Sequence, residues 1–301
     1  MSERHAILGA GGIGGLMGAM LAAGGDDVTL IVRAATVAEY PPVITLRRPD
    51  GSVVSGPARA AAGLAPGEVV DVLWVTTKAL QLDDALRSVS ASRPRCVVPL
   101  LNGLDHIAKL EGVFGADVVI PGTIAIEAER LAPGVVRQGG PRGMLRLAER
   151  GRPLLAKTAA ILEPYGFGVE FVADERTLMW SKLLFLAPFA LTTTASGEPL
   201  GYIRDHPEWS ALMKAAVEEV AAAGRAEGAT LDPAYAEGIV SIAPAGTSSS
   251  MARDVAAGNE PELDAIAGAV VRAAERHSIP VPTLRDLMQR VRERMAHGAA
   301  R

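Results

Sequence analysis

The order of sequence patterns along the chain is the feature that most limits its fold. Up to residue 126, short apolar runs alternate with helical patterns. The runs lie at 6–9, 27–33, 43–48, 69–78, 96–102 and 118–126, and helices are expected at 13–23, 79–90 and 104–110. Continuous apolar strands that alternate with helices predict a parallel sheet covered on both faces. Further strands expected at 135–139, 143–149 and 169–172 would extend this sheet.

Strand patterns end near residue 172. Helices are expected at 174–195, 207–227, 233–243, 247–257, 260–277 and 283–296. In the fifth of these, apolar residues recur at helical spacing from Leu263 to Ala274, which predicts one buried stripe. The sequence therefore predicts an α/β domain over residues 1–172 and an all-α domain over residues 173–301.

Composition and charge exclude several classes of protein. The 301 residues carry a net charge of −4, which argues against binding nucleic acid by electrostatic attraction. The only cysteine, Cys96, rules out an intrachain disulfide framework and fits a reducing compartment. The start of the chain lacks a long apolar signal segment, and the longest apolar run, at 183–191, contains Pro188 and is shorter than the ~18 residues of a membrane helix. We expect a cytoplasmic protein with no nucleic-acid or membrane partner and, because the five histidines are scattered, no metal site.

The stretch "GAGGIGG" at 9–15 follows the first strand and opens the first helix. Its glycines match G-x-G-x-x-G, in which the first makes a tight turn, the second admits a pyrophosphate and the third lets the helix pack on the strand. With 32 glycines in the chain the match alone is weak, and a glycine-rich turn without a ligand is the alternative. The context favours a Rossmann-type dinucleotide-binding domain. The expected loop residues are Gly9, Ala10, Gly11, Gly12, Ile13 and Gly14.

Three polar residues follow apolar strands at the edge where this loop lies. Arg33 stands where a site for NAD usually has an acid, and its guanidinium suits a 2′-phosphate, so the sequence predicts NADP. Lys78 is expected to neutralise a phosphate or a substrate carboxylate, and Asn102 to bind cofactor or substrate. The alternatives are a solvated strand-end arginine, a surface lysine and a turn residue of the dipeptide "NG".

The second half offers candidates for catalysis. Lys182 lies in the apolar helix "TLMWSKLLFL", where burial would lower its pKa and make it a proton donor for a carbonyl that accepts hydride. The alternative is a lysine whose head reaches water. Glu262 is a candidate partner, but with Asn259 it could equally form a capping box at a helix start. The hydroxyls at 247–250 suit either substrate contact or an ordinary helix cap.

Together these motifs resemble the ketopantoate reductases (2-dehydropantoate 2-reductases) over essentially the whole chain. "GAGGIGG" with Arg33, "TTKALQ", "LNGLD", "PGTIAIEA", "WSKLLF" and "SSSMARDVAAGNEPELD" are similar to the motifs of that family. The resemblance implies NADPH as cofactor and a 2-oxo acid as substrate. It implies that Lys182 and Glu262 are catalytic, that Ala128 lies by the cofactor, and that Ser250 binds substrate.

One departure concerns the substrate. Family members that reduce ketopantoate carry asparagines one and two helical turns after the catalytic lysine, where this chain has Leu186 and Ala190. An apolar pocket discriminates less strongly than one built to hydrogen-bond a hydroxyl. The expected reaction is reduction of 2-dehydropantoate to pantoate in pantothenate biosynthesis. A reductase for a more apolar carbonyl compound, a non-catalytic NADP(H) sensor and a methyltransferase that uses S-adenosylmethionine stay open as alternatives, as does a homodimer.

Overall fold

The computed structural model describes residues 2–299, and it divides into two compact units. The first comprises the chain to Leu101 and Asp105–Glu175. The second comprises Asn102–Leu104 and the chain from Arg176 onward. The sequence predicts one boundary, after residue 172. In the structure the division falls after Glu175, and Asn102–Leu104 also belong to the second unit.

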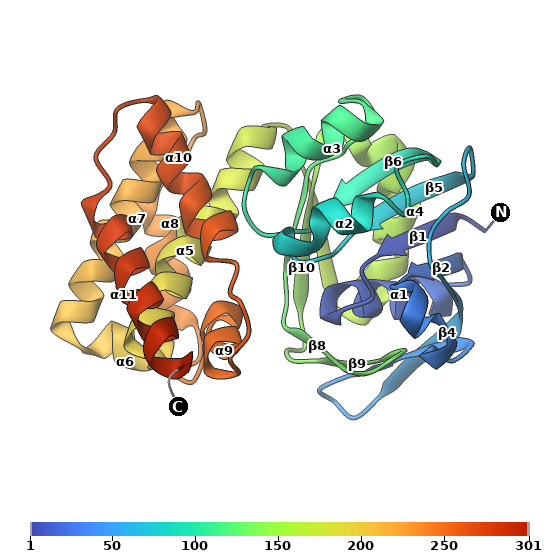
Figure 1. Ribbon diagram of the computed structural model, residues 1–301, viewed down its shortest axis with the longest axis horizontal. Coiled ribbons are helices and arrows are strands. Elements are labelled where there is room, and N and C mark those ends of the chain that lie inside the picture. Colours follow the sequence, from blue (N-terminus) through green and yellow to red (C-terminus); the bar gives the residue numbers. More distant parts are fainter. Residues whose placement is uncertain (1, 300–301) are drawn as a thin grey trace. The chain divides into compact units, whose positions relative to one another are not determined.

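The first unit is built on an eight-stranded sheet with the strand order β6-β5-β1-β2-β4-β3-β9-β8 (Figure 1). The five strands from β6 to β4 are parallel, as the alternating pattern predicts for four of them, and β4 was not predicted. At the other end the pairing is mixed, because β3 runs antiparallel to β4 and β8 antiparallel to β9. The bounds are β1 (Arg4–Leu8), β2 (Asp27–Ile31), β3 (Val43–Arg47), β4 (Val53–Ala61), β5 (Val69–Val75), β6 (Arg93–Pro99), β8 (Ala128–Ala132) and β9 (Val135–Gln138).

The prediction that the later strands belong to this sheet was wrong for three of them, those expected within 118–126, at 143–149 and at 169–172. β10 (Gly143–Ala148) and β11 (Phe167–Val172) form a separate three-stranded sheet with β7 (Gly122–Ala125), in the order β11-β10-β7. The parallel pair β10–β11 is joined by the unpredicted helix α4 (Arg152–Leu162). A local pattern identifies a strand but not its partner, and partner choice is what separates the two sheets.

Helix α1 (Gly12–Ala23) is the centre of the first unit. It has no charged or hydrogen-bonding side chain, and it contacts β1, β2, β3, β4, β8 and β9. A helix that is apolar all round is stable only when it is buried, and α1 fulfils that condition. The helix expected at 79–90 is shorter. The remaining helical segments are η1 (Ala34–Glu39), η2 (Ala79–Gln81), α2 (Leu82–Leu86), α3 (His106–Phe114), η3 (Glu149–Gly151) and η4 (Glu163–Tyr165).

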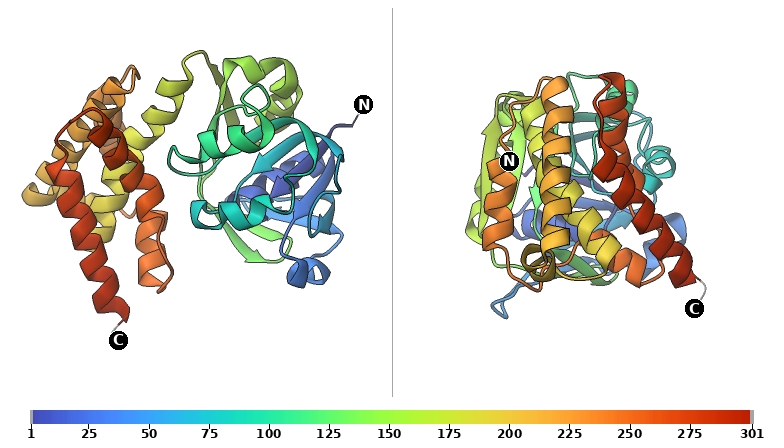
Figure 2. Two further views of the ribbon diagram at one scale, coloured as in Figure 1. Left: turned by 45° about the horizontal axis from the view of Figure 1, so that its top comes forward. Right: turned by 90° about the vertical axis from the view of Figure 1, so that its left-hand side faces the viewer.

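The second unit consists of helices among its described residues. α7 packs against α6, α8, α10 and α11 around a core of alanine, leucine and valine with Trp180 (Figure 2). All six expected helices are present, and the short α6 was not predicted. The bounds are α5 (Glu175–Ser196), α6 (Leu200–Asp205), α7 (Pro207–Ala226), α8 (Pro233–Ile242), α9 (Ser250–Ala256), the π-helical turn η5 (Asp264–Gly268), α10 (Ala269–Arg276) and α11 (Pro282–Ala299).

Helix α5 continues through Pro188. The hydroxyls of Thr192 and Thr193 donate to the carbonyls of Pro188 and Phe189, both at 2.7 Å. By length and composition α5 could cross a membrane, but 72% of its most apolar 18-residue window is buried inside the protein. That burial is typical of a core helix.

Candidate functional site

The glycine loop has the geometry that a dinucleotide phosphate requires. Gly9 has φ +98°, a conformation that side chains rarely adopt. A Cβ at Gly14 would lie 2.2 Å from the Gly9 carbonyl oxygen, so glycine is needed there for the helix to approach the strand. At Gly11 a Cβ would meet nothing within 4 Å, so this side of the loop is open. Gly9 thus makes the expected turn and Gly14 the expected close approach, and Gly11 leaves space beside the loop.

The start of α1 is free to bind an anion. Gly11 is its N-cap, no side chain caps the helix, and its first turn contains no acid. Unpaired N–H groups at a helix N-terminus, together with the helix dipole, favour a phosphate. Ala128, at the start of β8, lies against this point, because a Cβ at Gly12 would be 2.1 Å from the Ala128 carbonyl oxygen. The structure therefore brings Ala128 to the loop. The remaining predicted loop residues, Ala10 and Ile13, are respectively buried and half-buried.

Arg33 and Lys78 lie beyond the ends of the two strands that flank β1. β2 and β5 both pair in parallel with β1, and Leu8 is in register with Ile31 and with Val75. Arg33 precedes η1 with its side chain exposed, and Lys78 precedes η2 half-buried. Both cationic side chains therefore start from the sheet edge at which the glycine loop lies, as the sequence predicts.

Asn102 belongs with the second unit, and its side chain contacts a residue 160 positions later in the chain. Its Nδ2 donates to Oε2 of Glu262 at 3.0 Å. Gly103 has φ +90°, and a Cβ there would lie 2.1 Å from the carbonyl oxygen of Ala265 in η5. The "NG" dipeptide therefore makes a turn and also sets the Asn102 amide against a carboxylate. Sequence reasoning did not single out Gly103, although the dipeptide carried its signal.

Glu262 does not form the capping box that was the alternative for it. Residues 259–262 are not helical, and the helix begins at Leu263. The backbone N–H of Ile266 donates to the Glu262 carbonyl at 3.0 Å, so Glu262 occupies the N-cap position and not the third helical position. The Glu262 side chain is buried with 9% exposure.

Lys182, on α5, is the third member of this cluster. Burial lowers the pKa of its ammonium group from 10.5 to about 8, and the Glu262 carboxylate opposes part of this shift. A group with this pKa is protonated at neutral pH and can still give up its proton. The cluster of Lys182, Glu262 and Asn102 therefore holds a transferable proton, an acceptor that keeps it charged, and an amide that fixes the acceptor.

The residues predicted to contact substrate differ in how exposed their side chains are. Ser249, not Ser250, caps α9 by accepting from the Ala252 N–H at 3.0 Å, so the helix-cap alternative is correct for Ser249. Ser250 is the first residue of α9 and is exposed. Leu186 is half-buried beside the apolar core, whereas Ala190 has 1% exposure and belongs to that core. Of the two positions expected to replace asparagines, only Leu186 is partly exposed.

A polar cluster at the opposite edge of the sheet uses none of the predicted residues. The buried His5 accepts a hydrogen bond from Trp74 Nε1 at its Nδ1 (3.1 Å), which leaves the proton on Nε2, 3.2 Å from Asp26. Lys157 Nζ lies 2.6 Å from the other Asp26 oxygen. Glu3, His5 and Asp26 have the spacing of metal ligands, but a ligating histidine donates its second ring N–H, and Trp74 occupies that place as a donor. Lys157 already supplies the cation.

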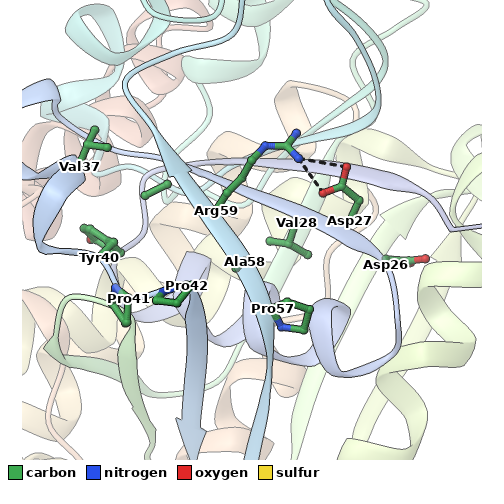
Figure 3. Close-up of a pocket in the computed structure, with 11 residues that line it drawn as sticks. Asp26, Asp27, Val28, Val37, Tyr40, Pro41, Pro42, Pro57, Ala58 and Arg59 are labelled. Atoms are coloured by element: carbon green, nitrogen blue, oxygen red, sulfur yellow. Dashed lines mark hydrogen bonds and ion pairs between the residues drawn. The ribbon is translucent and has the colours of Figure 1, made fainter.

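A shallow hollow lies on the face of β2 and β4. Figure 3 shows it between Val28 and Ala58 on the strands and the segment of Val37, Tyr40 and two prolines, with the Asp27–Arg59 ion pair at its rim. No predicted site residue lines it. One of its lining residues, Tyr40, also contacts the glycine loop by donating to the carbonyl of Ala10 at 3.4 Å.

Comparison with known proteins agrees with this geometry. The profile of the family "Ketopantoate reductase PanE/ApbA" matches residues 5–151, and that of its C-terminal domain matches residues 174–295. A 2-dehydropantoate 2-reductase of Caulobacter vibrioides is 31% identical over 285 residues, which cover 92% of this chain and 94% of the relative.

Two solved structures resemble the chain over nearly its whole length. A PanE/ApbA family ketopantoate reductase from Ralstonia eutropha JMP134 has a TM-score of 0.82 at 26% identity, covering 98% of this chain and 99% of its own. A D-mandelate dehydrogenase, solved with NADH and anilino(oxo)acetate, has a TM-score of 0.85 at 22% identity with the same coverage, a likeness that shows the fold alone. The chain belongs to the ketopantoate reductase family, a family of NADP-dependent oxidoreductases that act on CH–OH donors.

Proposed function

We propose that this protein reduces a 2-oxo acid to a 2-hydroxy acid with NADPH, and that 2-dehydropantoate is its substrate. The observation that carries the proposal is the contact of Asn102 with the buried Glu262 at 3.0 Å, which holds a carboxylate that favours the charged form of Lys182. A carbonyl that accepts hydride develops negative charge on its oxygen, and a positioned ammonium group stabilises that charge and donates the proton.

The residues of the first unit fit the cofactor. The uncapped start of α1 and the open side of Gly11 would take the pyrophosphate, and Arg33 and Lys78 would neutralise phosphate charge. Bound NADPH would supply the hydride.

Side chains of the second unit would hold the proton and transfer it to the substrate. Lys182 holds it on Nζ and passes it to the carbonyl oxygen, ending as the neutral amine, and solvent restores the proton. Glu262 favours the charged form of Lys182, and Asn102 holds the Glu262 carboxylate by donating to it. Ser250 and Asn102 would position the carboxylate and polar groups of the substrate.

A second candidate substrate is a 2-oxo acid with a bulky apolar side chain. Leu186 supports it, because this half-buried leucine lies where the resemblance to ketopantoate-reducing members implies an asparagine. The D-mandelate dehydrogenase with the same fold acts on a hydroxy acid of that kind. An initial-rate assay of NADPH consumption with 2-dehydropantoate and a panel of aliphatic and aromatic 2-oxo acids decides between the two by the ratio of kcat/KM values.

The variant Lys182→Ala tests the proton donor. We expect it to abolish turnover while the Kd for NADPH stays unchanged, with the exposed Lys214→Ala on α7 as the control that keeps full activity. Equal loss of turnover and of NADPH binding would contradict the role of Lys182. NADPH binding by the wild type without turnover of any carbonyl would instead support the sensor alternative.

Assembly and location complete the proposal. A cytoplasmic homodimer, with small molecules as its only other partners, fits the family and the single buried cysteine. Light scattering of the purified protein measures its mass in solution, and a monomer at micromolar concentration would contradict the dimer.

A further inference from the structure

A tyrosine links the glycine loop to a strand that no motif singled out. The hydroxyl of Tyr40 donates to the carbonyl of Ala10 at 3.4 Å. The same hydroxyl accepts from Nη1 of Arg130, on β8, at 3.3 Å. Because both contacts share one oxygen atom, the Arg130 guanidinium is held next to the loop expected to bind the dinucleotide. All three residues belong to the first unit.

The charge of Arg130 is available to a ligand. Its side chain is exposed, and one N–H of its guanidinium binds the Tyr40 hydroxyl, which is neutral. Its neighbour on β8, Glu129, pairs with Arg137 of β9 at 2.5 Å and not with Arg130. A guanidinium has five donors in a planar fork, so most of them remain for an anion.

Arg33 stands at the other end of the same short segment. η1 runs from Ala34 to Glu39 and connects Arg33 to Tyr40. Within residues 2–297, the structure gives the exposed Arg33 guanidinium no hydrogen-bond or ion-pair partner. A phosphomonoester carries a charge of about −1.5 to −2 at neutral pH, which one guanidinium does not neutralise. Arg33 precedes this segment, and Tyr40 at its end binds Arg130 of β8. Neither guanidinium group pairs with an acid among the described residues, and together they match that charge.

We propose that Arg130 is a second cation for the 2′-phosphate of NADPH, and that with Arg33 it makes the protein select NADPH over NADH. The proposal rests on the assignment of the cofactor above and adds to it a residue outside the family motifs. Tyr40 is a positioning residue, because it touches Arg130 and the loop and holds the one against the other.

Direct binding measurements test this without activity. The Kd values of NADPH, NADH and adenosine 2′,5′-bisphosphate are measured by calorimetry or by the fluorescence of the bound nicotinamide, for the wild type and for Arg130→Ala. We expect the variant to bind NADPH and the bisphosphate about tenfold or more weakly, the size of one lost charge-assisted contact. We expect its Kd for NADH to change by less than about twofold, because NADH lacks the phosphate.

Arg137→Ala is the matched control. It removes one positive charge from the same β8–β9 hairpin, but that charge is already paired with Glu129. We expect this variant to bind both dinucleotides as the wild type does. Tyr40→Phe keeps the ring and removes the shared hydroxyl. We expect this variant to raise the Kd of NADPH more than the Kd of NADH. The increase for NADPH should be smaller than in Arg130→Ala.

The outcomes separate this proposal from the proposed function. Tight NADPH binding by the wild type with an unchanged Kd in Arg130→Ala overturns the role of Arg130 and leaves the reductase assignment intact. Equal weakening of NADPH and NADH shows that Arg130 only braces the loop, and it overturns the proposal as well. Failure of the wild type to bind NADPH or the bisphosphate overturns both.

Discussion

Replacement of Glu262 by glutamine tests the electrostatics of the proposed proton donor. The pKa of Lys182 is about 8 because burial lowers it and the Glu262 charge raises it. Without the Glu262 charge only the effect of burial remains, so the pKa of Lys182 falls further, by the factor of about 10–1000 in the proton dissociation constant that an opposite charge typically contributes. Glutamine keeps a carbonyl oxygen that can accept from Asn102, so the variant removes the charge and preserves a hydrogen-bond acceptor.

The magnitude at neutral pH follows from the protonated fraction. Reduction needs protonated Lys182, so its rate is lost as pH rises through the pKa. At pH 7 the fraction falls from about 90% to between about 50% and about 1%, which lowers kcat/KM by about two- to ninetyfold. The assay is a pH profile of kcat/KM for the reduction, with the Kd of NADPH measured in parallel. We expect the alkaline limb to move from near pH 8 to lower pH, with activity restored in acid.

The control for this variant is Glu260→Gln, two residues earlier in the chain and exposed. We expect the alkaline limb of its pH profile of kcat/KM to lie at the same pH as in the wild type. A limb that stays near pH 8 in Glu262→Gln would refute the reasoning, because Lys182 would then not be the group that titrates.

Two further predictions follow from the loop and from the core. Gly11→Ala should weaken NADPH binding but leave the free energy of unfolding nearly unchanged, because a Cβ there meets nothing within 4 Å. Gly14→Ala should lower the free energy of unfolding by about 1–3 kcal/mol, because its Cβ would crowd the Gly9 carbonyl. Urea unfolding and NADPH titration measure the two effects, and equal stability of the two variants would contradict the packing argument. Burial raises the pKa of the Cys96 thiol to about 12, so the native protein should not react with a thiol reagent at neutral pH and should react fully in urea, and fast reaction of the folded protein would contradict it.

What could be predicted from sequence depended on how far apart the interacting residues are. The strand, glycine loop and α1 lie within the first 23 residues, so their roles follow from local pattern. β4 was missed because Gly56 and Pro57 resemble a turn, yet both lie within a strand paired on either side. The separate sheet of β10 and β11 was missed because strand pairing is a long-range choice.

The site was predictable in its residue types but not in its assembly. The contact of Asn102 with Glu262 joins residues 160 positions apart, and no spacing rule gives it. Likewise, the link from Arg130 through Tyr40 to Ala10 joins three segments that pair only in the folded unit.

Asn102–Leu104 belong to the second unit, and this limits how the chain can be divided into fragments that fold. A fragment that starts at Arg176 would contain Lys182 and Glu262 but not Asn102, which donates to Glu262, nor Gly103, which lies against Ala265. The Glu262 carboxylate would lose its amide donor, and the carbonyl of Ala265 would lose the glycine packed against it. The helical unit is therefore not encoded by one continuous segment. A fragment designed to fold as this unit alone must also include the Asn102–Leu104 segment. Without it, the Glu262 carboxylate has no amide donor.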